Sequence, residues 1–200
     1  MTEQKIVGVF GSAATPPGTD NYAQSYAVGR LLAEANYAVL TGGYGGVMGG
    51  VSHGAAEVNG RVIGVTVGLF RQRGLQPNPW VNEEVELPTL RERLNYLITR
   101  PDAYVVMNGG VGTLAEVSLA WSLMQVREIA PRPMILFGAA WQAFMEVFAQ
   151  YSTIRSEDLK YLTFVGQPEA IVPALEGWWS APPMIAPRLG DVQAPSEDAK

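Results

Sequence analysis

The stretch from Val106 to Val117 reads VMNGGVGTLAEV and joins a run of strand-forming residues to a helix-forming stretch. Three of the four residues from Gly109 to Gly112 are glycine. A glycine costs roughly 0.5–1 kcal/mol against alanine inside regular structure, so this cluster indicates a backbone shape that side chains would block. At the start of a helix, glycines allow a phosphate to approach unpaired N–H groups. The stretch therefore predicts a strand, an anion-binding turn and a helix.

Apolar runs alternate with helical patterns on both sides of this stretch. The predicted strands cover residues 5–11, 37–43, 61–67, 102–107, 134–138 and 162–166, and the predicted helices cover residues 21–36, 46–60, 87–100, 113–128, 139–152 and 168–179. Strands that are nearly continuous in apolar residues are typical of a parallel sheet covered by helices on both faces. We therefore predict a single α/β domain with a Rossmann-like, doubly wound parallel sheet of five or more strands.

Two segments stand outside this alternation. The connection from Gly68 to Leu87 is rich in Pro, Asn and Gly, and we expect it to lie over the site as a loop. Residues 181–200 are Pro-rich and show no periodicity, so we expect a surface-hugging or mobile C-terminal arm. Residues 1–180 then form the Rossmann-like nucleotide-binding domain.

Charge and composition exclude several classes of function. The 200 residues carry a net charge of −5, and no basic stripe is available for a nucleic-acid backbone. No apolar run reaches the ~18 residues that a membrane helix needs. With no cysteine and with His53 as the single histidine, which we interpret as structural, the sequence argues against a zinc site. We predict no cofactor and no metal, although a Mg²⁺ site made of carboxylates is left open. The absence of cysteine fits a cytoplasmic protein.

Three glycine-containing loops follow predicted strands and should meet at one edge of the sheet, because strand-to-helix loops of a doubly wound fold share an edge. None of them has the dinucleotide-binding or the Walker A pattern, which disfavours a nicotinamide cofactor. We expect a phosphate-bearing small molecule there, and the alternative is an ordinary tight turn without a ligand. The candidate phosphate- or nucleotide-binding residues are Gly11, Ser12, Gly45, Gly46, Gly109, Gly110, Val111, Gly112 and Thr113.

Two charged residues are candidates for the chemistry of this site. Glu116 either faces the ligand or belongs to a capping box with Thr113, since both have the T-x-x-E spacing. Arg93 lies in the first turns of a predicted helix whose start is at the same sheet edge. It is a candidate anion clamp.

With these residues assembled, the chain resembles the LONELY GUY (LOG) family and its bacterial relatives, often labelled "lysine decarboxylase-like". The family motif PGGxGTxxE is similar to the stretch from Asn108 to Glu116, and the resemblance covers roughly residues 5–150. It implies a nucleotide phosphoribohydrolase, which cleaves a nucleoside 5′-monophosphate to a free base and ribose 5-phosphate. By the same resemblance, Glu116 and Arg93 are the catalytic pair.

The chain also departs from the family pattern. Asn108 replaces the proline of the motif, Leu94 replaces a lysine, and Ala115 replaces the first of two glutamates. These changes look more like a divergent branch that includes proteins resembling molybdenum cofactor carriers. The resemblance thus leaves a second function open, a non-catalytic binding or carrier protein for a phosphorylated ligand.

The remaining predictions concern lysine chemistry and assembly. Decarboxylation with pyridoxal phosphate needs a lysine in the pocket, and the only lysines, Lys5, Lys160 and Lys200, all lie outside the glycine loops. The chain is therefore not predicted to be a lysine decarboxylase. We expect a homodimer, because two predicted helices carry more large apolar side chains than one sheet face needs, the alternative being that they all pack on the sheet. These side chains are Trp121, Met124, Trp141 and Phe144.

Overall fold

A computed structural model describes residues 4–186, in which all strands belong to one parallel seven-stranded sheet with the order β4-β3-β2-β1-β5-β6-β7. The strands are β1 (Ile6–Phe10), β2 (Ala38–Thr41), β3 (Val62–Val67), β4 (Glu83–Leu87), β5 (Ala103–Val106), β6 (Met134–Phe137) and β7 (Leu162–Val165). The predicted α/β class and the doubly wound parallel sheet are confirmed.

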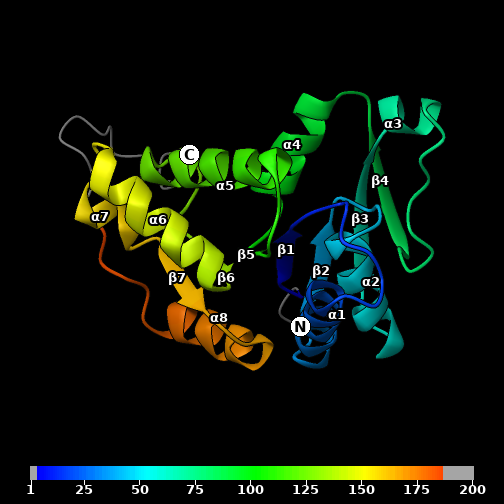
Figure 1. Cartoon of the computed structure of the whole chain (residues 1–200), viewed down its shortest axis with the longest axis horizontal. Coiled ribbons are helices and arrows are strands. Elements are labelled where there is room, and N and C mark those ends of the chain that lie inside the picture. Colours follow the sequence, from blue (N-terminus) through cyan, green and yellow to red (C-terminus); the bar gives the residue numbers. More distant parts are fainter. Residues whose placement is uncertain (1–3, 187–200) are drawn as a thin grey trace, which may run out of the picture.

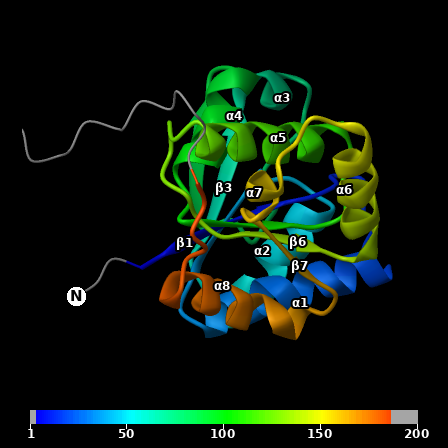
Figure 2. The same ribbon diagram turned by 90° about the vertical axis from the view of Figure 1, so that its left-hand side faces the viewer.

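Helices cover both faces of the sheet (Figures 1 and 2). One face is covered by α4 (Leu90–Thr99), α5 (Val111–Gln125) and α6 (Ala139–Tyr151), and the other by α1 (Asp20–Glu34), α2 (Val47–Glu57) and α8 (Ile171–Ser180). Each face has its own apolar core, which is why the strands are apolar on both sides. Among the residues that the structure describes, no helix combines the length and the apolar character needed to span a bilayer.

The connection from Gly68 to Leu87 was expected to be a loop, and this is wrong at both ends. It begins with α3 (Gly68–Gln72) and ends with β4, the strand at one edge of the sheet. The β4 sequence EEVEL does not show the pattern of a buried strand. Alternate positions carry exposed glutamates, and only Val85 and Leu87 pack against the core. Charged residues on an edge strand discourage pairing with other chains, so this composition is compatible with a strand.

Two smaller elements near the C-terminus also differ from the prediction. A short helix, α7 (Ser156–Leu159), precedes β7 and was not predicted. The segment expected to be one helix over residues 168–179 divides into a 3₁₀ turn, η1 (Pro168–Ala170), and α8.

The order of the strands creates a crevice beside β1. The chain builds β1 to β4 on one side of the sheet and then returns to place β5 on the other side of β1. Ligands of open parallel sheets bind at the carboxyl ends of the strands at such a switch point. The loops after β1, β2 and β5 all end at this edge.

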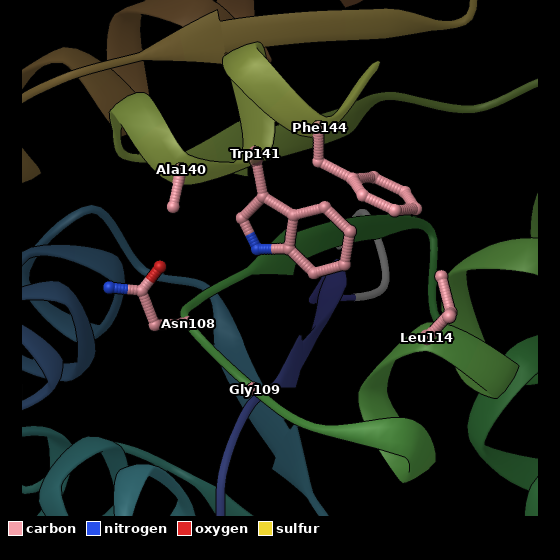
Figure 3. Close-up of a pocket in the computed structure, with 6 residues that line it drawn as sticks. All are labelled: Asn108, Gly109, Leu114, Ala140, Trp141 and Phe144. Carbon is pink, nitrogen blue, oxygen red and sulfur yellow. The ribbon is translucent and has the colours of Figure 1, made fainter. Parts of the chain in front are cut away.

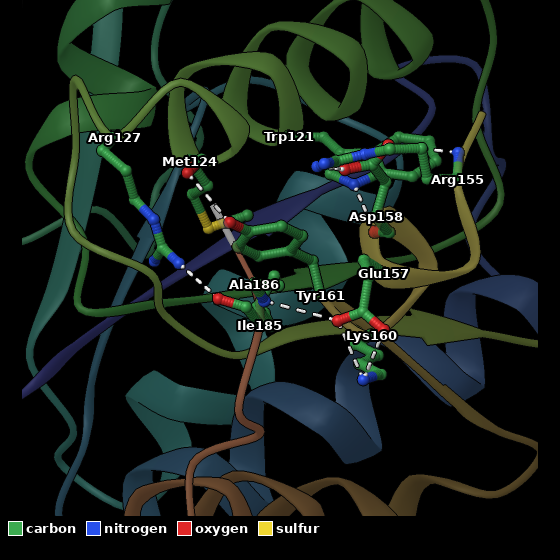
Figure 4. Close-up of polar contacts among 10 residues, drawn as sticks. All are labelled: Trp121, Met124, Arg127, Arg155, Glu157, Asp158, Lys160, Tyr161, Ile185 and Ala186. Carbon is green, nitrogen blue, oxygen red and sulfur yellow. Dashed lines mark hydrogen bonds and ion pairs between the residues drawn. The ribbon is translucent and has the colours of Figure 1, made fainter. Parts of the chain in front are cut away.

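Residues 181–186 lie along the face covered by α5 and α7 (Figure 4). The side chain of Ile185 is buried in the core below α5. The Arg127 guanidinium donates to the Ile185 carbonyl oxygen at 2.9 Å, and the Ala186 N–H donates to the Glu157 carboxylate at 3.3 Å. This part of the predicted arm hugs the surface, while residues 187–200 lie outside the described residues.

Candidate functional site

A cavity of about 330 Å³ lies at the crevice beside β1. It brings together residues that are far apart in the sequence and were predicted as site residues, namely Gly11, Ser12, Arg93, Gly110, Gly112, Thr113 and Glu116. The structure therefore gathers both candidate charged residues and the start of α5 around one space.

The backbone of Ser12 holds the glycine loops in place. Its N–H donates to the carbonyl oxygen of Asn108 in the loop after β5 at 3.0 Å. Its carbonyl oxygen accepts from the N–H of Val47, the first residue of α2, at 2.8 Å. These two hydrogen bonds connect the loops after β1, β2 and β5. Backbone contacts therefore fix the positions of the three loops at the edge of the cavity.

The glycines of these loops divide into two groups. Gly46 has a φ of +67°, and a Cβ on it would lie 2.2 Å from the carbonyl oxygen of Ser12. A Cβ on Gly109 would lie 2.1 Å from the Thr113 hydroxyl oxygen, so glycine is required at both positions by packing. Gly110 and Gly112 differ, because a Cβ there would meet nothing within 4 Å. The space that these two leave free is part of the cavity.

Some predicted binding residues are not part of the cavity wall. Gly45, Gly46 and Gly109 are absent from its lining, and the side chain of Val111 is 86% exposed and does not line it either. The structure therefore brings only part of each predicted glycine loop to the cavity.

The start of α5 is open toward the cavity. The N-cap residue of this helix is Gly110, which offers no side chain to its first N–H groups. The capping-box alternative for Thr113 and Glu116 is wrong, because Thr113 lies inside the helix rather than at the cap. An uncapped helix start carries unpaired N–H groups and about half a positive charge, which is suited to an anion.

Glu116 lies on α5, beyond this open start, and its carboxyl group is half-buried. Burial raises its pKa from 4.5 to about 7, and the nearby charge of Arg93 opposes the rise. The carboxyl group can therefore gain or lose a proton near neutral pH, a property that is common at functional sites.

Arg93 of α4 is buried and is held by main-chain oxygens. Its Nε donates to the carbonyl oxygen of Val65 at 2.7 Å, and its Nη2 donates to that of Gly42 at 3.0 Å. A Cβ on Gly42 would lie 2.1 Å from Nη2, so the glycine after β2 makes room for the guanidinium. Burial lowers the pKa of Arg93 and Glu116 opposes this, but an arginine remains charged at any ordinary pH. Arg93 is thus a fixed positive charge near Glu116.

The apolar part of the cavity wall contains none of the predicted site residues. Its large side chains are Tyr44, Met48, Phe70 and Leu75. Phe70 and Leu75 come from the connection that was expected to lie over the site, and they do line it. Their signal was present in the sequence, since large apolar residues are unusual in a loop rich in Pro, Asn and Gly.

A second cavity of about 360 Å³ lies beside the same loop and next to α6 (Figure 3). It is lined by Asn108, Gly109, Leu114, Ala140, Trp141 and Phe144, none of which is charged. The indole N–H of Trp141 donates to the carbonyl oxygen of Met107 at 3.0 Å, which fixes the ring. The groups expected to bind an anion, which are Arg93 and the N–H groups at the start of α5, therefore lie at the first cavity.

The lysines and the histidine lie elsewhere. The Lys5 ammonium is 4.7 Å from the ring centroid of Trp179, and Lys160 pairs with Glu157. Neither lines the cavity, and Lys200 lies outside the described residues. His53 stacks on Trp80 with 4.3 Å between ring centroids, which agrees with a structural role.

The fold and the site together define a doubly wound α/β protein with an open helix start and a half-buried carboxyl group at the switch point of its sheet. A model of the SLOG cluster4 family matches residues 4–154, and the chain belongs to this family, within the LOG and lysine decarboxylase-like superfamily. The resemblance inferred from the glycine motif is confirmed at this level.

Similar proteins include one from Mycobacterium tuberculosis named cytokinin riboside 5′-monophosphate phosphoribohydrolase. It is 31% identical over 123 residues, which are 61% of this chain and 65% of that protein, so slightly less than two thirds of the relative is matched.

Two solved structures have a similar fold. The molybdenum cofactor binding protein of Rippkaea orientalis has a TM-score of 0.71 at 23% identity, over 88% of this chain and 98% of that chain. The molybdenum cofactor carrier protein of Chlamydomonas reinhardtii has a TM-score of 0.70 at 24% identity, over 88% and 99%. At these identities the likeness is one of fold.

Proposed function

We propose that this protein hydrolyses the N-glycosidic bond of a nucleoside 5′-monophosphate. The bond between C1′ and the base nitrogen breaks, the hydroxyl of a water molecule joins C1′, and its proton ends on the base. The products are a free base and ribose 5-phosphate. The observation that carries this proposal is the position of the Glu116 carboxyl group in the same cavity as the open start of α5.

In this proposal, the start of α5 binds the phosphate and Glu116 acts on the sugar. The N–H groups at the start of α5 would bind the 5′-phosphate, with Gly110 and Gly112 allowing its close approach. Binding the phosphate fixes the position of the sugar relative to Glu116. As the base departs, the ribose gains positive charge, which a carboxylate stabilises while it orients the attacking water.

Arg93 supports this reaction through Glu116. Its guanidinium is already bonded to two carbonyl oxygens, so its charge mainly acts on the carboxyl group and on the anionic ligand across the cavity. Without that charge, burial would raise the pKa of Glu116 further and would leave less carboxylate at neutral pH.

The relatives support the same reaction class. The name of the M. tuberculosis relative describes a phosphoribohydrolase that acts on a riboside 5′-monophosphate, although that similarity spans only part of both proteins. The direct test is to incubate the purified protein with a panel of nucleoside 5′-monophosphates and to measure free base by chromatography. Release of base from none of them would contradict the proposal.

The second candidate is a carrier that binds a phosphorylated ligand, such as a nucleotide or the molybdenum cofactor, without breaking it. The departures at Leu94 and Ala115 favour it, because charged residues of the hydrolase pattern are missing there. The two molybdenum cofactor proteins show that the same fold is used by proteins of that kind. A carrier would bind its ligand tightly and release no base.

A further inference from the structure

The wall of the first cavity, the one that contains Glu116, includes a short segment that crosses from β3 toward β4. Residues 68–75, which we call the cover segment, comprise α3 and the turn after it. The segment contributes Phe70 and Leu75 to the cavity lining. Neither side chain carries a hydrogen-bonding group, so these two side chains can contact a ligand only through apolar surface.

Phe70 rests on a fixed aromatic residue. Its ring centroid is 5.6 Å from that of Tyr44, at an interplanar angle of 59°. Tyr44 is buried, and its hydroxyl oxygen accepts a hydrogen bond from the N–H of Val67 at 3.0 Å. Phe70 itself is only half-buried, so its ring is supported from one side and is still available to the cavity.

Ion pairs hold the cover segment on the sheet. Arg71 pairs with Glu84 and, at 2.6 Å, with Glu86, both on β4. The Thr66 hydroxyl donates to Glu84 at 2.6 Å and fixes this carboxylate on the neighbouring strand. An isolated helix of five residues is not stable in water, so α3 depends on such anchors for its position.

We propose that the cover segment recognises the flat heteroaromatic ring of the ligand, with Phe70 as the specificity-determining residue and Arg71 as a positioning residue. The proposal rests on the proposed function, in which the open start of α5 binds the phosphate of the same ligand. An aromatic side chain stacks on the face of any base, whereas selection of one base needs hydrogen-bond donors and acceptors. The cover segment therefore distinguishes a ligand with a ring from one without, and by itself it favours no single base.

The test compares a ligand that has the ring with one that lacks it. Binding of AMP and of ribose 5-phosphate is measured by calorimetry in the Glu116→Gln background, which is expected to keep AMP intact. Phe70→Ala should weaken AMP binding roughly tenfold or more, the scale of one lost stacking contact, and should leave ribose 5-phosphate within twofold. Phe70→Trp should retain AMP binding. In the Glu116→Gln protein with Phe70 intact, the dissociation constants of AMP, GMP and CMP should lie within about tenfold of one another.

Two further variants separate recognition from simple damage to α3. Leu69 is on the same helix, 40% exposed and not part of the cavity wall, so Leu69→Ala should change neither affinity. Arg71→Met keeps most of the side-chain stem but removes the ion pairs with β4. It should weaken AMP binding severalfold and again leave ribose 5-phosphate unaffected.

The outcomes that overturn the proposal are distinct from failure of the proposed function. Equal losses for AMP and ribose 5-phosphate in Phe70→Ala, or no loss for AMP, would overturn ring recognition by the cover segment. A wild-type protein that binds neither ligand would overturn both proposals. A wild-type protein that releases no base, but whose AMP affinity alone depends on Phe70, would contradict hydrolysis and support ring recognition.

Discussion

Arg93 and Glu116 lie on consecutive helices, α4 and α5, line one cavity, and shift each other's pKa. Burial pushes both groups toward their neutral forms, and the charge of each opposes that effect on the other. Arg93 is fixed by bonds to the backbone after β2 and within β3, so it is a permanent charge. The ionisation of Glu116 is the variable part of this arrangement.

Replacing Glu116 with glutamine tests the role of its charge. Glu116→Gln keeps the size of the side chain but removes the negative charge that would face the ribosyl cation. We expect base release to fall by roughly 10²–10³-fold while nucleotide binding survives, the scale of one lost electrostatic stabiliser. Chromatography of samples quenched at fixed times measures the rate of base release, and calorimetry measures the affinity for the nucleotide. Glu146→Gln, on the exposed surface of α6, is the matched control. Unchanged turnover in Glu116→Gln would rule out a catalytic carboxylate.

The rate should depend on pH through the same group. If the ionised form of Glu116 is the active one, kcat/KM rises from pH 5 to pH 8 with a midpoint near its pKa of about 7. Arg93 remains charged over this range, so its ionisation does not change the pH profile of kcat/KM. A pH series with a saturable nucleotide assay gives the midpoint. A rate that falls over this interval would instead assign Glu116 the role of a general acid.

Stability should also change with pH, in the opposite direction. The folded protein holds the proton of Glu116 more tightly than the unfolded chain does, because the pKa rises from 4.5 to about 7. This contribution is fully present below pH 4.5, is lost as the pH rises to about 7, and stays lost above it. Glu116→Gln buries no charge and should therefore exceed the wild type in stability at pH 8 by about 1–3 kcal/mol, with little difference at pH 4.5. Denaturant unfolding at the two pH values measures this, and a Gln variant that is less stable at pH 8 would contradict the assignment.

Gly112 should show opposite effects on binding and on stability. It is the second residue of α5, where most residues favour a helix more than glycine does, and a side chain there meets open space. Gly112→Leu should raise the melting temperature and block the phosphate. Gly177→Leu is the matched control, because Gly177 lies in α8 with equally open surroundings and away from the cavity. Loss of nucleotide binding in both variants, or in neither, would argue against the phosphate site.

We also expect the protein to form a homodimer, on a surface that differs from the one the sequence suggested. Trp121, Met124 and Trp141 are buried and pack in the core, which leaves only Phe144 of that group exposed. The exposed apolar side chains on α6 recur at helical spacing and form one stripe, consisting of Phe144, Val147, Phe148 and Tyr151.

A charge in the middle of this stripe tests the dimer. Phe148→Asp should give a monomer by light scattering at micromolar concentration, whereas the wild type should have the mass of two chains. Leu69→Asp introduces the same charge on α3, near the opposite edge of the sheet (Figure 1), and should leave the mass unchanged. A monomeric wild type would contradict the expectation.

Most of the fold could be predicted because buried parallel strands are apolar on both faces and helices have a different periodicity. Strand β4 could not, since an edge strand needs only alternate apolar residues and its glutamates resemble a loop. The short helices α3 and α7 were missed for a related reason. The position of α3 depends on the ion pairs of Arg71 with β4. The position of α7 depends on a local ion pair between Arg155 and Asp158 and on the hydrogen bond that the Trp121 indole of α5 donates to the Asp158 carbonyl oxygen, so neither helix shows a periodicity of its own.

The site could be predicted only in part. The convergence of the glycine loops follows from the topology, which the sequence indicates. Whether a glycine serves packing or a ligand depends on what lies beyond its missing Cβ, and that separates Gly46 and Gly109 from Gly110 and Gly112. The bonds of Arg93 to Val65 and Gly42 cross between helix and sheet, and no local pattern predicts them.

The burial of Ile185 has a consequence for synthesis of the protein on the ribosome. Domains generally fold from the N-terminus as the chain emerges, and the sheet and its helices are complete before this residue appears. The core below α5 nevertheless lacks one of its members until Ile185 arrives and Arg127 binds its carbonyl oxygen. The nascent chain thus leaves apolar surface uncovered at this position until residues 181–186 have emerged from the ribosome. A chaperone that binds such surface would contact the protein on this face up to that point.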